Sequence, residues 1–200
     1  MNHTTFIFYK PYQVLCQFSA EGDKKTLAAY FSDIKKDVYP VGRLDYDSEG
    51  LLVLSNDKQL NHRLLDPSFA HEREYWVQVE GTPTEEALSQ LRKGVGINVD
   101  GKMYRTKPAT VAWLQDEPIV PERNPPIRFR KSIPTSWLSL SLTEGKNRQV
   151  RKMTAAVNLP TLRLIRRKIG NITIENLAPG DFVIADESMV AQLFQKNNSK

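Results

Sequence analysis

Short stretches in which apolar residues run together or alternate with polar ones dominate this chain. Continuous apolar runs at residues 6–9 and 51–54 predict strands buried on both faces. Residues 74–80 and 137–142 alternate cleanly and predict strands with one buried face. Shorter strands are expected at residues 14–18, 103–105, 109–114, 160–168, 170–174 and 182–185.

Helical spacing is less frequent than strand patterns. It predicts helices at residues 24–31, 57–65, 85–93 and 148–157, the second capped by Asn56 or Asp57. Strands therefore outnumber helices, and the helices interrupt them irregularly. This pattern favours an α+β fold with a mixed, mostly antiparallel central sheet and flanking helices.

The predicted helix at residues 148–157 separates charge from apolar surface. At about 100° per residue, Arg148, Arg151 and Lys152 fall on one face. The opposite face, made of Val150, Met153 and Val157, is expected to be buried. The first turn of such a helix also presents free backbone N–H groups, which favour a bound phosphate.

The length of 200 residues suits one domain, or two small lobes that share a cleft. We expect a single domain over residues 1–196 and a disordered tail over residues 197–200. No apolar run is long enough to span a membrane, and the N-terminus has no signal-peptide pattern. A lone Cys16 and three scattered histidines give no metal motif. We therefore expect a cytoplasmic, metal-free protein.

The charge of the chain is strongly uneven. Residues 123–168 hold twelve Lys or Arg and one acid, Glu144, a net charge of +11. The whole chain carries +5, so the remainder carries −6. Such asymmetry predicts a surface for a polyanion on the C-terminal half. The proline-rich stretch at residues 118–134, within which Arg128 lies, is expected to be either a functional loop or a disordered linker.

A loop with three carboxylates precedes the apolar run at residues 51–54. It reads GRLDYDSEG at positions 42–50. One interpretation is an ordinary turn, with Asp45 a solvated partner of Arg43. A calcium loop is rejected, because Asn56 stands where a bidentate glutamate is required. The third interpretation is a catalytic carboxylate on a loop held by a buried strand.

Four segments in order resemble the RsuA-type RNA pseudouridine synthases. They are FYKP at positions 8–11, GRLDYDSEGLL at 42–52, YWVQV at 75–79 and EGKNRQVRKM at 144–153. The resemblance implies the pseudouridine synthase catalytic fold, with two lobes around a central RNA-binding cleft. Most relatives begin with a small S4-type RNA-binding domain, whereas this chain begins almost at the catalytic segments. RNA affinity is then expected from the core and its basic half.

The same resemblance implies roles for individual residues. Asp45 would be the catalytic carboxylate, Tyr75 would stack on uracil, and Arg151 would pair with Asp45. Leu164 would form an apolar wall against uracil. The expected RNA contacts are Lys10, Arg43, Arg128, Arg148, Lys152, Arg163 and Arg166.

The implied reaction converts a uridine of 23S ribosomal RNA to pseudouridine. The N-glycosidic bond breaks, uracil rotates, and C5 joins the sugar, so no cofactor is needed. Asp45 would either attack C1′ of the ribose or remove the C2′ proton. The expected partner is 23S rRNA, free or in a large-subunit precursor, bound by a monomer.

Two other functions compete with this one. The basic segment alone also fits a non-catalytic rRNA-binding or ribosome-assembly protein. A glycosidase that pairs Asp45 with Asp47 fits poorly, because a turn does not guarantee the carboxylate spacing that the reaction requires.

Overall fold

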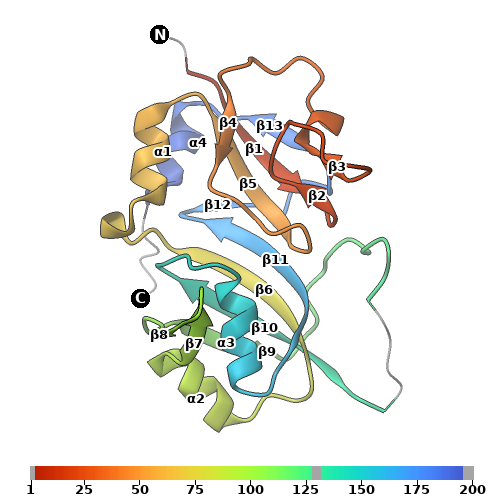
Figure 1. The fold of residues 1–200 in the computed structure, drawn as a ribbon, viewed down its shortest axis with the longest axis vertical. Coiled ribbons are helices and arrows are strands. Elements are labelled where there is room, and N and C mark those ends of the chain that lie inside the picture. The colour runs from red at the N-terminus through yellow and green to blue at the C-terminus, as the bar shows by residue number, and fades with distance from the viewer. Residues whose placement is uncertain (1–2, 128–131, 196–200) are drawn as a thin grey trace. The chain divides into compact units, whose positions relative to one another are not determined.

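The structure is a computed structural model that describes residues 3–127 and 132–195 (Figure 1). Its chain divides into two compact units. Within the described chain, unit 1 holds residues 3–71 and 166–195, and unit 2 holds residues 72–127 and 132–165. Predictions for Arg128 and for the tail at 197–200 lie outside the described residues. None of the helices in the described chain is long and apolar enough to cross a membrane.

Unit 1 is built on a mostly antiparallel sheet in which the strand β5 is fully buried. The order of its strands is β13-β1-β5-β11, with β4 paired to β5 and β12 to β11. Every residue of β5 is buried, as its continuous apolar run predicts. The elements are β1 Thr5–Lys10, β2 Val14–Leu15, β3 Lys25–Thr26, η1 Leu27–Ala29, β4 Tyr39–Val41, β5 Glu49–Ser55, α1 Lys58–Leu65, η2 Pro67–Phe69, β12 Ile172–Thr173, β13 Phe182–Ile184 and α4 Glu187–Gln192. The strand β11 Thr161–Ile169 begins in unit 2 and ends in unit 1.

Unit 2 contains a second run of strands in the order β11-β6-β10-β9 and a separate hairpin, β7–β8. The pairs β6–β10, β9–β10 and β7–β8 are antiparallel. Buried residues of these strands and of two helices form one hydrophobic core. The elements are β6 Arg73–Glu80, α2 Glu85–Lys93, β7 Gly96–Val99, β8 Lys102–Arg105, β9 Thr110–Leu114, β10 Thr135–Leu142 and α3 Gln149–Ala156.

The structure confirms the α+β class and most predicted elements, but the helix predicted at residues 24–31 is wrong. This segment forms β3 and the short 3-10 helix η1. Thr26 is extended and makes no side-chain cap, and the Tyr30 N–H donates to the Leu27 carbonyl, which closes the turn early. The helix predicted at residues 57–65 is confirmed as α1, in which Leu60 and Leu64 are buried whereas Leu65 is 45% exposed at the end of the helix.

Candidate active site

The acidic loop, residues 42–50, joins β4 to β5 in unit 1 and is fixed at several points. The Ser48 N–H donates to the Asp45 carbonyl at 3.1 Å, which forms a tight turn. The Leu44 N–H donates to Cys16 Sγ at 3.3 Å, and the Gln13 N–H donates to the Tyr46 carbonyl at 2.9 Å. The loop is therefore held against residues 13–16 by its backbone, and Asp45 is half-buried on it.

The loop ends at Gly50, where β5 lies close to β11. Gly50 has a φ of +107°, and a Cβ at this position would lie 2.3 Å from the Arg166 carbonyl oxygen. Because such a contact is impossible, only glycine lets the two backbones approach here. The Arg166 side chain is also buried, and its Nε donates to the Leu51 carbonyl at 2.7 Å. Arg166 thus secures the start of β5, and its buried Nη2 makes no hydrogen bond to any described residue.

Lys10 supplies a buried positive charge close to the acidic loop. Its side chain is 0% exposed, and Nζ donates to the carbonyls of Pro11 and Val14, both at 2.8 Å. Burial lowers the pKa of Lys10 to about 8, although Cys16 and the carboxylates of the acidic loop, Glu49, Asp47 and Asp45, act in the opposite direction. The sequence predicted an RNA contact for Lys10, but a side chain without exposed surface is placed to support the loop instead.

Tyr75 lies on β6 in unit 2, opposite Leu140 of β10. It is half-buried and packs against the core that contains Val77 and Val79, as the alternation of this strand predicts. Leu164 on β11 is 5% exposed and belongs to the same core.

The helix α3 in unit 2 carries two of the predicted cations, Arg151 and Lys152, whereas Arg148 precedes it as its N-cap with a φ of +52°. Val150, Met153 and Val157 are buried, which confirms the predicted apolar face. Arg148 is exposed, whereas Arg151 and Lys152 are half-buried. Arg151 Nη1 donates to the Thr161 carbonyl at 3.4 Å, and this contact joins α3 to the start of β11.

Two arginines connect β11 to the proline-rich stretch that precedes β10. Arg163 is 6% exposed, and its Nη2 donates to the Pro121 carbonyl at 2.8 Å. Arg123 Nη1 donates to the Leu162 carbonyl at 3.4 Å. The described part of this stretch is therefore tied to unit 2 by guanidinium groups.

Sequence reasoning missed the role of Glu144. It is buried, and its Oε1 accepts from the Lys107 N–H at 2.8 Å and from Gln149 Nε2 at 2.6 Å. Its Oε2 accepts from the Tyr104 hydroxyl at 2.6 Å. Burial raises the pKa of Glu144, but these hydrogen bonds prevail and hold the pKa below its usual value. The only hint in the sequence was its isolation as a single acid among twelve cations.

The predicted residues thus divide between the units. Lys10, Arg43, Asp45 and Arg166 belong to unit 1, and Tyr75, Arg148, Arg151, Lys152, Arg163 and Leu164 belong to unit 2. The pairing of Asp45 with Arg151 stays a prediction. Within the described ranges, no cluster of three or more His, Cys, Asp or Glu side chains could hold a metal ion.

Comparison with known proteins gives consistent matches. A protein-family model described as RNA pseudouridylate synthase matches residues 4–156. Ribosomal large subunit pseudouridine synthase E of Xanthomonas axonopodis pv. citri is 54% identical over 172 residues, covering 85% of this chain and 87% of the relative. The protein of the same name from Vibrio parahaemolyticus is 50% identical over 181 residues, covering 90% of this chain and 73% of the relative.

A solved structure supports the same conclusion at the level of the fold. The crystal structure of a pseudouridylate synthase superposes with a TM-score of 0.77 at 26% identity, covering 96% of this chain and 74% of the other. The family model covers well over half of the chain, and both named relatives are similar along most of their length. This chain therefore belongs to the RNA pseudouridylate synthase family, in its RsuA-type branch.

Proposed function

We propose that this protein isomerises a uridine of 23S ribosomal RNA to pseudouridine, with Asp45 as the catalytic carboxylate. The observation that carries the proposal is the family match over residues 4–156, because that range contains Asp45, Tyr75 and Arg151. The choice of large-subunit RNA follows the names of the two relatives that are 54% and 50% identical.

The geometry of the acidic loop suits a catalytic carboxylate. Asp45 lies in a turn whose backbone is bonded to residues 13–16, so its carboxylate is carried by a fixed loop. Buried Lys10 places a positive charge near that loop. In this arrangement Asp45 either attacks C1′ of the ribose or removes the C2′ proton, and both steps require its ionised form.

The remaining site residues serve binding and orientation. Tyr75 stacks on uracil, Leu164 offers apolar contact, and Arg151 pairs with Asp45. A uridine in folded RNA must leave its stack to react, at a free-energy cost of about a few kcal/mol. Phosphate contacts from Arg43, Arg148 and Lys152, whose side chains are exposed or half-buried, offset that cost.

Replacement of Asp45 by asparagine tests the assignment. The substrate is a 23S rRNA transcript that carries tritium at uracil C5, which is released to water when C5 joins the sugar. We expect Asp45→Asn to slow release by at least about a thousandfold, because the amide neither attacks C1′ nor accepts the C2′ proton. RNA affinity should stay within about twofold of the original protein.

Asp47→Asn is the matched control, because it removes one charge from the same loop. It should retain most of the activity. Equal losses in the two variants would assign the effect to the charge of the loop rather than to Asp45. Absence of tritium release from every 23S fragment by the unmodified protein would overturn the proposed function itself.

A further inference from the structure

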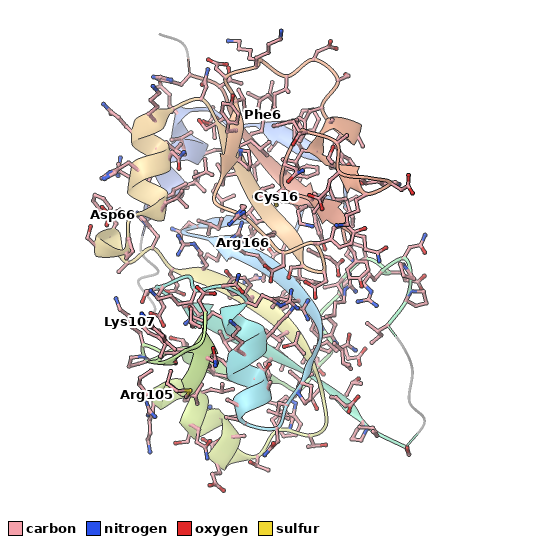
Figure 2. All side chains as sticks on the ribbon, viewed as in Figure 1. Phe6, Cys16, Asp66, Arg105, Lys107 and Arg166 are labelled. Atoms are coloured by element: carbon pink, nitrogen blue, oxygen red, sulfur yellow. The ribbon has the colours of Figure 1, made fainter. Side chains whose placement is uncertain are left out.

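The β7–β8 hairpin and the turn before α3 carry exposed cations outside the predicted RNA-binding residues. Lys102, Arg105, Lys107 and Lys146 are all exposed, and none belongs to the acidic loop. Figure 2 labels Arg105 and Lys107, whose side chains project from the ribbon of unit 2 beside this hairpin. We call these four side chains the hairpin surface.

We propose that the hairpin surface is a second binding site for the phosphate backbone of the RNA substrate. The inference rests on the proposed function for the identity of the ligand, because an RNA-modifying enzyme meets RNA as its polyanion. It extends the polyanion surface predicted for residues 123–168, to which Lys146 belongs, to Lys102, Arg105 and Lys107, which lie outside that segment.

The buried carboxylate of Glu144 accepts hydrogen bonds from two residues of this part of unit 2. Glu144 accepts the backbone N–H of Lys107 at 2.8 Å and the Tyr104 hydroxyl at 2.6 Å. The Lys146 ammonium lies 4.9 Å from the centre of the Tyr104 ring, a distance typical of a cation–π contact. Lys107 and Lys146 therefore flank the same contact between Tyr104 and Glu144, although the residues come from different segments of the chain.

The balance of exposed charge favours an anionic ligand. Glu144 is 6% exposed, and three donors occupy its oxygens, so it adds little negative charge to the surface. Asp100, in the turn of the hairpin, is an exposed acid next to these cations in the chain. The exposed cations of Lys107 and Lys146, which flank the contact between Tyr104 and Glu144, attract the RNA backbone and release its counterions, which makes binding dependent on salt.

Backbone hydrogen bonds hold Lys107 and Lys146 in place, which distinguishes them from scattered surface lysines. The Gln149 side chain also accepts the Lys146 N–H at 2.8 Å while it donates to Glu144. The backbones of both lysines are thus fixed by hydrogen bonds before any ligand arrives. Fixed backbones reduce the entropy that is lost when the side chains order on RNA.

A change of all four residues to glutamine tests the proposal. Binding of a 23S rRNA fragment to Lys102→Gln/Arg105→Gln/Lys107→Gln/Lys146→Gln would be measured over a range of KCl concentrations. We expect affinity at low salt to fall at least about tenfold and the slope of log K against log [KCl] to lose about 2–3 units. Tritium release would show mainly a raised KM.

The matched control removes four exposed cations from unit 1 through Lys25→Gln/Lys35→Gln/Lys36→Gln/Lys58→Gln. It changes the net charge equally and should leave the salt slope near its original value. Equal slopes for the two quadruple variants would overturn the proposal. The variant Lys102→Arg/Lys107→Arg/Lys146→Arg keeps every charge and should keep the slope, which separates loss of charge from a folding defect.

The outcomes separate this inference from the proposed function. If the unmodified protein binds rRNA but releases no tritium, the enzymatic proposal fails. The slopes of log K against log [KCl] then still test whether the hairpin surface binds RNA. If the glutamine variant binds naked rRNA normally and loses only binding to ribosomal particles, the surface contacts a protein and the RNA proposal is wrong.

Discussion

The acidic loop of unit 1 and the hairpin surface of unit 2 carry opposite charges, and so do the buried groups next to them. In unit 1, the buried ammonium of Lys10 lies near a loop of carboxylates. In unit 2, the buried carboxylate of Glu144 lies beneath exposed cations. Each of these two segments therefore lies near a buried group of opposite charge, and that group is hydrogen-bonded to backbone groups and neutral side chains.

The two buried charges differ in how well they are solvated by the protein. Lys10 donates hydrogen bonds to the carbonyls of Pro11 and Val14, yet burial still dominates its pKa. Glu144 receives three donors, and these outweigh burial. Hydrogen bonds compensate for lost water only when their number and geometry suffice.

The largest expected effect on stability comes from Lys10→Met. It leaves the Pro11 and Val14 carbonyls without their donor and removes the positive charge from the acidic loop. We expect the free energy of unfolding to fall by about 2–4 kcal/mol in urea titrations at pH 7. Lys24→Met, which breaks an exposed pair with Glu21, should produce no measurable change. A similar result for both variants would remove the structural role assigned to Lys10.

Glu144→Ala should have the next largest effect, a loss of about 2 kcal/mol, because it leaves the Lys107 N–H and the Gln149 amide without their acceptor. Glu144→Gln is the informative partner variant. Its oxygen can accept both donors while its amide donates to the Tyr104 hydroxyl, so about half of the loss should be recovered. Equal stability of the alanine and glutamine variants in urea would show that charge, not hydrogen bonding, holds this contact.

The smallest expected effect is a pH dependence of the free energy of unfolding that is caused by Lys10. Its pKa is about 8 when folded and 10.5 when unfolded, so between these values the unfolded chain binds the extra proton. Stability attributable to Lys10 therefore rises with pH in this window, by up to about 1.4 kcal/mol per unit. The difference in unfolding free energy between the unmodified protein and Lys10→Met should widen from pH 8 to pH 9.5. A constant difference would contradict the lowered pKa.

The sequence predicted those parts of the fold that follow from local periodicity. The fully buried β5, the alternating β6 and β10, and the apolar face of α3 all follow the hydrophobic pattern. Where the hydrophobic periodicity was weak, the prediction was wrong or absent. The 3-10 helix η1 lies where a longer helix was predicted, and β7 and α4 were not predicted. These short elements depend on contacts with distant segments, which periodicity does not contain.

In the candidate site, too, features encoded in the local sequence were predicted, whereas features that depend on distant segments were not. The motif around Asp45 could be identified from spacing and resemblance alone. The position of Glu144 could not, because Tyr104 and Lys107 lie 40 and 37 residues away from it in the chain. Burial of the Lys10 ammonium also escaped prediction, since lysine is seldom fully buried.

Gly50 limits how the acidic loop can diversify. A side chain there would overlap the backbone of Arg166, so the end of the loop admits no chemical variation. A substitution that alters the environment of the loop carboxylates must therefore be made at residues 42–49 or in the segments that pack against them. Gly50 has no side chain that could react, yet its close approach to Arg166 determines where the carboxylates of the acidic loop are positioned.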